Sequence, residues 1–372
     1  MSRIRLLPSH LVDQIAAVEV IERPASSLKE LLENALDAVA TQIIIDITDG
    51  GVSSISVSDN GCGMNADELS LAVKRHATSK LPAANLFEIK SFGFRGEALP
   101  SIAAVSDLEI SSRTATLEHG WKIRIEHGDI HAPEPVAHAV GTTVCVKELF
   151  EKIPARRKFL KTQRTEAGQC LEVVKQLAMA TPNVSFIFTD TGKTLLNLPA
   201  RTDDSSAIRD RLSDVMGHVF AKEAVMLDAR KNDCGLLGLM GLPTMNRPTT
   251  QYTNIFVNQR PVKDKQLIGA VRAAYSDTLP KGRYPIIVLF ISVSLENVDV
   301  NVHPAKSEVR FSNPGTIRGL IVGSIQSSLR ESGIHTTAEN AQNILNRLVF
   351  STRGVNSGRT VQPNLPQDNT SC

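Results

Sequence analysis

The sequence predicts an α+β protein with two folded domains, and three observations support this fold class. The chain has 372 residues, which is long enough for two domains that each bury a core. Its hydrophobic content of 42% and charged content of 22% are typical of soluble globular proteins. Helix-like and strand-like periods both occur, and their pattern changes near Ala221. We therefore predict a first domain over residues 1–220 and a second over residues 221–334.

The first half of the chain opens with an amphipathic helix and a hairpin. In residues 28–37, leucine and alanine side chains form one helical stripe, and acidic or amide side chains form the opposite one. Two β-type runs within residues 42–58 are separated by a glycine turn, which predicts an antiparallel hairpin. Asn65 and Glu68 have the spacing of a helix-capping box. Residues 76–96 show no clean period and predict a long loop or lid.

Further strands and helices follow along the rest of the chain. In the first domain, strands are predicted at residues 107–110, 121–126 and 142–146, and helices near residue 96, around residues 171–178 and at residues 208–220. In the second domain, strands are predicted at residues 224–228, 236–242, 254–257 and 286–293, and helices at residues 267–275 and 317–332. Glycine, asparagine, proline and serine dominate the end of the chain, so we assign residues 335–372 to a linker or disordered tail.

Composition and charge argue against several classes of protein. The net charge of +2 is too small to indicate nucleic-acid binding by itself, so such a role needs local clusters of cations. The five cysteines are scattered and form no Cys-x-x-Cys pair, which indicates reduced thiols without a zinc site or a disulfide framework. The N-terminus lacks the apolar segment of a signal peptide, and the longest apolar run, residues 285–291, is too short for a membrane span. We therefore expect a cytoplasmic protein.

One candidate binding motif, Asp59-Asn-Gly-Cys-Gly63, directly follows the second strand of the predicted hairpin. A carboxylate at the end of a strand can accept a hydrogen bond from an exocyclic amine. Gly61 and Gly63 would let a flat ring lie against the backbone. An Asx turn that only closes the strand explains the same residues, so the motif alone leaves both interpretations open.

A second candidate motif is the glycine-rich loop Gly93-Phe-Arg-Gly96, which leads into a helix. Free N–H groups at a helix N-terminus can hold a phosphate chain, although a flexible connection would have the same composition. Residues 75–80 add two cations and two hydroxyl groups, and residues 141–143 open a strand with a Gly-Thr pair. Taken singly, these segments are equally compatible with ordinary surface loops.

The order of these motifs resembles that of the GHKL ATPases. An acid-and-amide helix, an Asp-x-Gly-x-Gly turn, a glycine-rich lid and a Gly-Thr strand follow one another at similar spacing. Within this group, the chain resembles the MutL family of DNA mismatch repair proteins over about residues 4–332. The segments that carry this closer likeness are residues 14–26, 75–80, 93–99, 154–160 and 299–311. The resemblance implies a GHKL (Bergerat) ATPase α/β sandwich followed by an α/β domain like that of ribosomal protein S5.

The resemblance also implies roles for the polar face of the first long helix. Glu30 would be the general base that polarises the water attacking the γ-phosphate of ATP. Asn34, one turn later, would supply an oxygen ligand to Mg²⁺. Lys306, from the second domain, would reach the γ-phosphate and take part in catalysis by distinguishing ATP from ADP. Glu33 is expected to be solvated surface, and Asp37 receives no definite role.

The remaining ATP contacts implied by the family surround the base and the phosphate chain. Asp59 would receive the adenine amino group, with Thr143 assisting through a water molecule, and Gly61 and Gly63 would line the base. A lid that orders around the triphosphate would contain Thr78, Ser79, Lys80, Gly93, Phe94, Arg95 and Gly96. The expected cofactors are therefore ATP and Mg²⁺.

The family further implies a function and a set of partners. The chain would be a nucleotide-switched clamp that links mismatch recognition to strand removal, forms a homodimer on ATP binding and works at the nucleoid. Its expected partners are DNA, bound without sequence preference, the mismatch-recognition protein MutS, and a downstream helicase or nuclease. The cations expected to contact DNA phosphates are Arg156, Arg157, Lys161, Arg260, Lys263 and Lys265. No endonuclease activity is expected, because the sequence lacks the C-terminal domain that carries it in the family.

Three residues depart from the family pattern. Val18, Val39 and Gln259 stand where glycine is usual. Val18 would be strained if its φ is positive and would cost little in a helix, whereas the other two positions are expected to tolerate other residues. Two alternatives stay open: the ATPase region of a type II topoisomerase-like protein, and an ATP-binding scaffold that no longer hydrolyses ATP.

Overall fold

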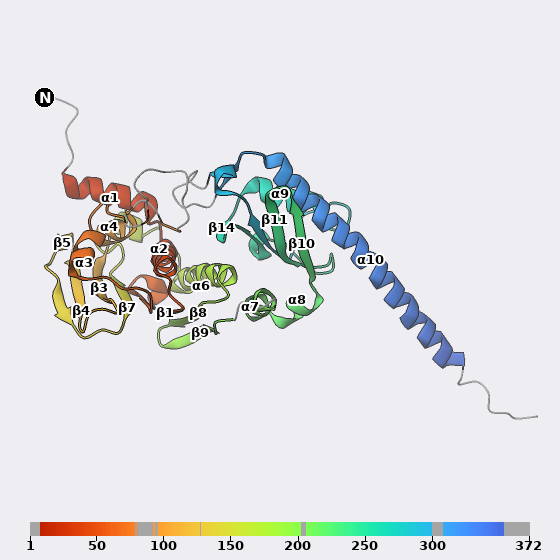
Figure 1. Cartoon of the computed structure of the whole chain (residues 1–372), viewed down its shortest axis with the longest axis horizontal. Coiled ribbons are helices and arrows are strands. Elements are labelled where there is room, and N and C mark those ends of the chain that lie inside the picture. Colours follow the sequence, from red (N-terminus) through yellow and green to blue (C-terminus); the bar gives the residue numbers. More distant parts are fainter. Residues whose placement is uncertain are drawn as a thin grey trace, which may run out of the picture. The chain divides into compact units, whose positions relative to one another are not determined.

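The computed structural model describes residues 8–78, 80, 92–93, 96–126, 128–201, 206–299 and 308–352. Residues 1–325 form one compact unit and residues 326–372 form another. Two large sheets, each with its own helices, account for most of the described part of the first unit (Figure 1).

The first sheet follows the order β5-β4-β3-β7-β2-β1-β8-β9, with β6 paired to β4. Its strands are β1 (Gln42–Thr48), β2 (Ser54–Asp59), β3 (Asp107–Arg113), β4 (Gly120–Glu126), β5 (Asp129–Ile130), β6 (Glu134–Val136), β7 (Gly141–Lys147), β8 (Ser185–Asp190) and β9 (Lys193–Leu198). The predicted hairpin is confirmed, because β1 and β2 pair antiparallel around the 3₁₀ turn η1 (Asp49–Gly51). Ile43, Ile45 and Ile47 alternate along β1 and are buried on the face that the helices cover.

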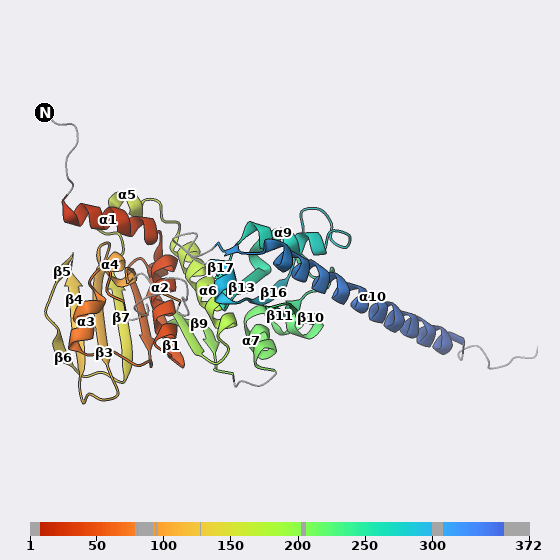
Figure 2. The ribbon, with the colours of Figure 1, turned by 45° about the horizontal axis from the view of Figure 1, so that its top comes forward.

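The helices of this part are α1 (Ser9–Val20), α2 (Pro24–Asp37), α3 (Ala66–Ala72), α4 (Ala98–Ala103), α5 (Pro154–Arg157) and α6 (Gln163–Ala180). Helices α2, α3, α4 and α6 contact the strands, whereas α1 packs on α4 (Figure 2). The predicted capping box at the start of α3 is confirmed. The Asn65 side chain accepts a bond from the Glu68 N–H, and the Glu68 carboxylate accepts one from the Asn65 N–H, both at 2.9 Å.

The second sheet follows the order β10-β11-β16-β13-β14 and contains all the strands predicted for this half of the chain. Its strands are β10 (Val225–Lys231), β11 (Cys234–Met240), β13 (Thr253–Val257), β14 (Arg260–Val262) and β16 (Ile287–Ser292). Two small pairs flank it, formed by β12 (Asn246–Arg247) with β15 (Tyr284–Pro285) and by β17 (Val298–Asp299) with β18 (Arg310–Phe311). The remaining helical elements are α7 (Ala207–Met216), α8 (His218–Glu223), α9 (Lys265–Ala274), α10 (Pro314–Thr352), η2 (Thr250–Tyr252) and η3 (Leu295–Asn297).

Two helical predictions differ from the structure. The helix predicted over residues 208–220 is divided into α7 and α8 at Gly217, whose φ of 99° ends the first of them. Helix α10 continues through residues 335–352, where the composition of the chain end predicts an irregular tail. This stretch contains neither glycine nor proline, so nothing in it interrupts a helix. Residues 353–372 lie outside the described residues.

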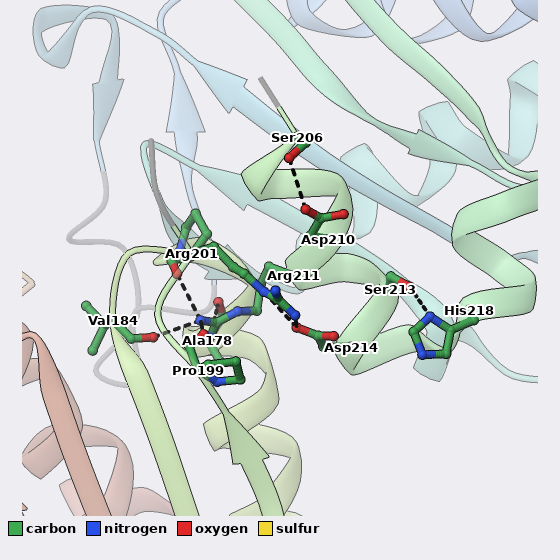
Figure 3. Close-up of polar contacts among 11 residues, drawn as sticks. Ala178, Val184, Pro199, Arg201, Ser206, Asp210, Arg211, Ser213, Asp214 and His218 are labelled. Atoms are coloured by element: carbon green, nitrogen blue, oxygen red, sulfur yellow. Dashed lines mark hydrogen bonds and ion pairs between the residues drawn. The ribbon is translucent and has the colours of Figure 1, made fainter. Parts of the chain in front are cut away.

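A buried arginine fixes α7 to the first sheet. The guanidinium of Arg211 is fully buried and donates hydrogen bonds of 2.7–3.3 Å to the carbonyls of Ala178, Pro182, Val184 and Pro199 (Figure 3). Burial lowers the pKa of Arg211 to about 10, so the side chain remains a cation at neutral pH. These four carbonyls come from α6 and from the segments beside β8 and β9, so one side chain joins three elements.

An apolar cluster continues this connection into the second sheet. Met179 and Ala180 at the end of α6 pack with Leu212 of α7 and with Phe256 and Val288 of the second sheet. Helix α6 also contacts β14. Because α6 also packs on α2, this shared core brings the start of β14 close to the polar face of α2.

Of the three residues that stand where glycine is usual, Val18 has no strained backbone. Val18 lies within helix α1 and has no positive φ, so it carries no such strain. Val39 and Gln259 have φ values of 59° and 67°, although the sequence predicts that these positions tolerate other residues. Asn258, with φ of 47°, precedes Gln259 in the turn between β13 and β14, so both central residues of this hairpin turn are left-handed.

Val39 closes helix α2 in a conformation that favours glycine. The Ala40 N–H donates to the Ala35 carbonyl at 3.2 Å, and the Val39 N–H donates to the Leu36 carbonyl at 3.0 Å. This is the Schellman arrangement, in which the left-handed position is usually glycine. The Val39 side chain is 80% exposed, so its β-branched carbons are strained without gaining contacts in return.

Replacing Val39 by glycine is therefore expected to raise the free energy of unfolding by about 0.5–1 kcal/mol, because relief of left-handed strain exceeds the entropic cost of glycine. The matched control is Val219→Gly in α8, where the side chain is 68% exposed and the backbone is helical. That change should lower the free energy of unfolding by about 0.5 kcal/mol. Urea unfolding of both variants measures the difference, and a destabilised Val39→Gly variant would contradict the strain.

Candidate functional site

Helix α2 separates an apolar face from a polar one, as its sequence predicts. It begins with Pro24 at its first turn and buries Leu28, Leu31 and Leu32, each at most 2% exposed. Its polar face carries Glu30, Glu33, Asn34 and Asp37. Other parts of the chain cover this face, so these side chains do not simply line bulk water.

Asp37 is the centre of the contacts on this face. Its carboxylate accepts bonds from the backbone N–H groups of Phe92 at 2.7 Å and Gly93 at 2.9 Å. The Lys80 ammonium lies 2.6 Å from Asp37 Oδ2 and 2.7 Å from Asn34 Oδ1. Asp37 therefore holds Lys80 and the start of the glycine-rich loop against α2, a role that the sequence left undefined.

Glu33 corrects the prediction of a solvated surface residue. It is 2% exposed and forms an ion pair of 3.7 Å with Lys29, one turn earlier on the helix. The sequence pattern places Glu33 on the same polar face as Glu30, but it cannot show which part of that face is covered. A cation from the second sheet lies near this part of α2.

That cation is Arg260, the first residue of β14. It is 7% exposed, and its guanidinium lies 5.7 Å from the centre of the Phe92 ring. Burial lowers the pKa of Arg260, and the nearby charges of Glu33, Asp37 and Glu30 oppose that shift. The prediction that Arg260 contacts DNA is corrected, because the buried side chain faces the acidic side of α2.

The Asp59 turn lies beside the C-terminal end of α2. The Cys62 N–H donates to the Ala38 carbonyl at 3.1 Å, and a Cβ on Gly61 would lie 2.7 Å from the same carbonyl oxygen. Gly63 has φ of 71°, and a Cβ there would lie 2.0 Å from the Arg113 carbonyl oxygen. Glycine is therefore required at both positions for the turn to pack this closely.

The Asp59 carboxylate is partly buried, and its surroundings act on its pKa in opposite directions. Burial raises the pKa of Asp59, whereas hydrogen bonds from the backbone N–H groups of Gly61 and Thr142 and the nearby His138 lower it. Asp59 Oδ1 accepts the Gly61 N–H at 2.8 Å. The group is thus oriented by the backbone while it stays available as a hydrogen-bond acceptor.

The threonine that shares a face with Asp59 is Thr142, which corrects the prediction of Thr143. In the register of β2 with β7, Asp59 lies opposite Thr142 and Ser58 lies opposite Thr143. Opposed residues point to the same face, and successive residues point to opposite faces. Thr143 instead contacts Ser58 at 2.9 Å and His138 at 3.0 Å on the other face of the sheet. The sequence signal that could have identified Thr142 is the alternation of apolar residues after it, because Val144 and Val146 share its phase along the strand.

The structure places some of the predicted lid residues but not all of them. Thr78 accepts the Lys80 N–H at 3.1 Å, and a Cβ on Gly96 would lie 2.3 Å from the Ala77 carbonyl oxygen, so these segments adjoin. Ser79, Phe94, Arg95 and Lys306 lie outside the described residues. Among the residues that the structure describes, no group of three or more His, Cys, Asp and Glu side chains could hold a metal ion.

The predicted DNA-contacting cations differ in how they are held. Arg156 donates to the Glu22 carbonyl at 2.8 and 3.1 Å, and Arg157 forms an ion pair with Glu151. The lysines that stay exposed are Lys161, Lys263 and Lys265. Within the described part of the chain, no helix has the length and apolar character of a membrane span.

Two family models match separate parts of this chain. The model described as histidine kinase-, DNA gyrase B-, and HSP90-like ATPase matches residues 22–141, which contain α2, the Asp59 turn and the glycine-rich loop. The model described as DNA mismatch repair protein, C-terminal domain, matches residues 212–330. The second match favours mismatch repair proteins over the topoisomerase alternative.

Similar proteins agree with these matches. The DNA mismatch repair protein MutL of Paramagnetospirillum magneticum is 50% identical over 331 residues, which are 89% of this chain and 54% of that protein. The MutL of Rhizorhabdus wittichii is 49% identical over 333 residues, 89% of this chain and 55% of that protein. The chain thus spans about half the length of the curated relatives it matches.

Solved structures confirm the predicted fold. The Aquifex aeolicus MutL ATPase domain complexed with ADP has a TM-score of 0.57 and 29% identity, and the match covers 74% of this chain and 95% of that one. The N-terminal domain of a DNA repair protein has a TM-score of 0.72 and 26% identity, covering 87% and 99%. This chain therefore belongs to the MutL family of DNA mismatch repair proteins.

Proposed function

We propose that this chain binds and hydrolyses ATP and is the nucleotide-switched part of a DNA mismatch repair protein. The observation that carries the proposal is the polar face of α2, which lies beneath Lys80 and Gly93 and beside the Asp59 turn. This arrangement combines an acid, an amide, a cation and a backbone that a ligand can approach closely, as nucleotide hydrolysis requires. A related MutL ATPase domain has been solved with ADP, which supports a nucleotide as the ligand.

In this proposal Glu30 is the general base and Asn34 is the ligand of Mg²⁺. Asn34 Oδ1 already accepts a bond from the Lys80 ammonium at 2.7 Å, so its oxygen faces a position that suits a cation. A neutral amide oxygen is an ordinary ligand for Mg²⁺, which binds through few protein groups together with phosphates. Mg²⁺ bound there would neutralise charge that develops on the phosphates. Lys80 would then exchange its contacts with Asn34 and Asp37 for the phosphate chain.

The base would be held at the Asp59 turn. We propose that Asp59 accepts a hydrogen bond from the adenine amino group, that Gly61 and Gly63 lie against the ring, and that Thr142 replaces Thr143 as the assisting hydroxyl. Thr78, Ser79, Gly93, Phe94, Arg95 and Gly96 would complete the phosphate site, with Lys306 at the γ-phosphate. For Ser79, Phe94, Arg95 and Lys306 this role is supported by the family resemblance alone.

The proposed domains and partners follow from the same family. Residues 1–220 would form the ATPase domain, residues 221–334 the domain like that of ribosomal protein S5, and the following residues a linker. Dimerisation on ATP binding, contact with DNA and MutS, coupling to a helicase or nuclease, and location at the nucleoid are all proposals. They are supported by the family resemblance, and this chain covers only 54% and 55% of the two MutL proteins described above.

The direct test measures ATP binding and phosphate release by the purified chain, with and without Mg²⁺ and DNA. We expect Mg²⁺-dependent hydrolysis that is slow, because rearrangement of the Lys80 and Asp37 contacts precedes chemistry. Binding without phosphate release in a single turnover would favour the scaffold that no longer hydrolyses ATP. The absence of binding at millimolar ATP would overturn the proposal.

DNA binding, if it occurs through phosphates, should depend on Lys263 and Lys265. Both side chains are exposed on either side of Asp264, the residue that caps α9. Changing both lysines to glutamate is expected to weaken binding equally for all sequences. The slope of log affinity against log salt should fall by about 0.9 for each DNA phosphate that the protein no longer neutralises. Lys193→Glu on β9 is the matched control, and an unchanged salt slope in the double variant would remove these two lysines from the interface.

A further inference from the structure

A buried serine hydroxyl connects three groups next to the Asp59 turn. Ser112 of β3 is fully buried and lies opposite Thr142 in the register of β3 with β7. Its Oγ lies 2.8 Å from the Met64 backbone nitrogen, 3.0 Å from the Gly141 carbonyl oxygen and 2.8 Å from Thr142 Oγ1. Each of these distances is within the range of a hydrogen bond.

Counting protons fixes the direction of these bonds. The Met64 N–H can only donate and the Gly141 carbonyl can only accept, so Ser112 accepts from the first and donates its single proton to the second. Without that proton, lone pairs of Ser112 Oγ and of the Gly141 carbonyl oxygen would face each other at 3.0 Å in a buried site. Because the Ser112 proton is used, the Thr142 hydroxyl must donate to Ser112 Oγ. All four groups are then satisfied.

This arrangement leaves Thr142 without a proton for a ligand. The oxygen of Thr142 can only accept a further hydrogen bond, from a ligand or from a water that donates to it. Asp59, opposite Thr142 on the same face, is also an acceptor. This part of the site thus presents two acceptors side by side, which suits an amino group and repels a carbonyl oxygen.

We propose that Ser112 is a positioning residue that holds the Thr142 hydroxyl as an acceptor and so makes the site prefer 6-amino purines to 6-oxo purines. The inference rests on the proposed nucleotide site and adds a specificity determinant to it. Ser112 itself touches no nucleotide, because its three contacts are with the protein and its side chain is fully buried.

The chain contains a matched hydroxyl pair on the opposite face of the same strands. Ser58 lies opposite Thr143 on β2 and β7, and their oxygens are 2.9 Å apart. Ser58→Ala therefore removes the same kind of contact, one residue away along β7, without changing the face that carries Asp59. It serves as the control for Ser112→Ala.

The experiment measures dissociation constants for ATP and GTP by titration calorimetry with the full chain. We expect the wild-type chain to prefer ATP, and Ser112→Ala to reduce the ratio of GTP to ATP dissociation constants about tenfold, because the freed Thr142 proton can then donate to a 6-oxo group. Ser58→Ala should leave the ratio unchanged. In a Thr142→Val background, Ser112→Ala should cause no further change, because the hydroxyl that Ser112 orients is gone.

The alternative outcomes are distinct. If Ser112→Ala lowers the affinities for ATP and GTP equally, or still shifts the ratio in the Thr142→Val background, Ser112 has only a structural role and the inference fails. If Ser112→Ala does not fold, Ser112→Cys, which retains a weak hydrogen-bonding group, should shift the ratio in the same direction by a smaller factor; an unchanged ratio would overturn the inference. A wild-type chain that binds neither nucleotide overturns the proposed function itself, whereas ATP binding with an unaltered ratio overturns only the role of Ser112.

Discussion

Replacing Glu30 by alanine is expected to lower the rate of ATP hydrolysis about 10³-fold, within the range lost with a general base, and to change ATP affinity less than threefold. Glu30 lies on the polar face of α2, where the hydrogen bonds that hold Lys80 and Gly93 are made by Asn34 and Asp37. Removing the Glu30 carboxylate should therefore leave the binding groups in place. Single-turnover phosphate release and equilibrium binding of ATP give the two quantities separately.

Asp59→Asn provides the opposite phenotype for comparison. The amide can present an N–H group where the carboxylate of Asp59 accepts, so this variant should lose ATP affinity at least tenfold. Hydrolysis should recover partly at saturating ATP. If Glu30→Ala and Asp59→Asn lose binding to the same extent, Glu30 contributes to binding and is not the base.

Local sequence patterns predict the elements of this fold well because each depends on near neighbours. The leucine stripe of α2 and the glycine turn between β1 and β2 are complete within a few residues. The parallel pairing of β1 with β8 is different, since the two strands are separated by most of the first domain and no local pattern encodes their contact. The break at Gly217 also escaped prediction, because the apolar spacing on its two sides is that of a continuous helix.

The site shows the same division between local and tertiary information. The Gly-Thr motif identifies the strand, but the alternation of side chains along that strand decides which threonine shares a face with Asp59. Choosing Thr143 in place of Thr142 puts the hydroxyl on the opposite face of the sheet. Glu33 has the helical position of a solvated residue, yet it is buried near the charge of Arg260, which comes from the other sheet. The different surroundings of Glu30, Glu33 and Asp37 are therefore set by tertiary contacts and not by the local sequence.

Replacing Arg260 by methionine is expected to lower the free energy of unfolding by about 3–5 kcal/mol at neutral pH, the range measured when one partner of a buried charge cluster is removed. Methionine retains most of the apolar volume of the side chain but not its charge. Glu33, 2% exposed, and Asp37 would then keep their ion pairs with Lys29 and Lys80 but lose the arginine charge beside them.

Arg247→Met is the control for Arg260→Met, because it also removes an arginine that lies over an aromatic ring. Arg247 is exposed and lies 5.5 Å from the centre of the Tyr252 ring, so its removal should cost less than about 1 kcal/mol. Arg260→Lys should retain part of the stability, because the charge remains while the planar guanidinium is lost. Urea unfolding at neutral pH measures all three variants. A loss for Arg260→Lys as large as that for Arg260→Met would mean that packing of the guanidinium on Phe92, and not charge, accounts for the burial of Arg260.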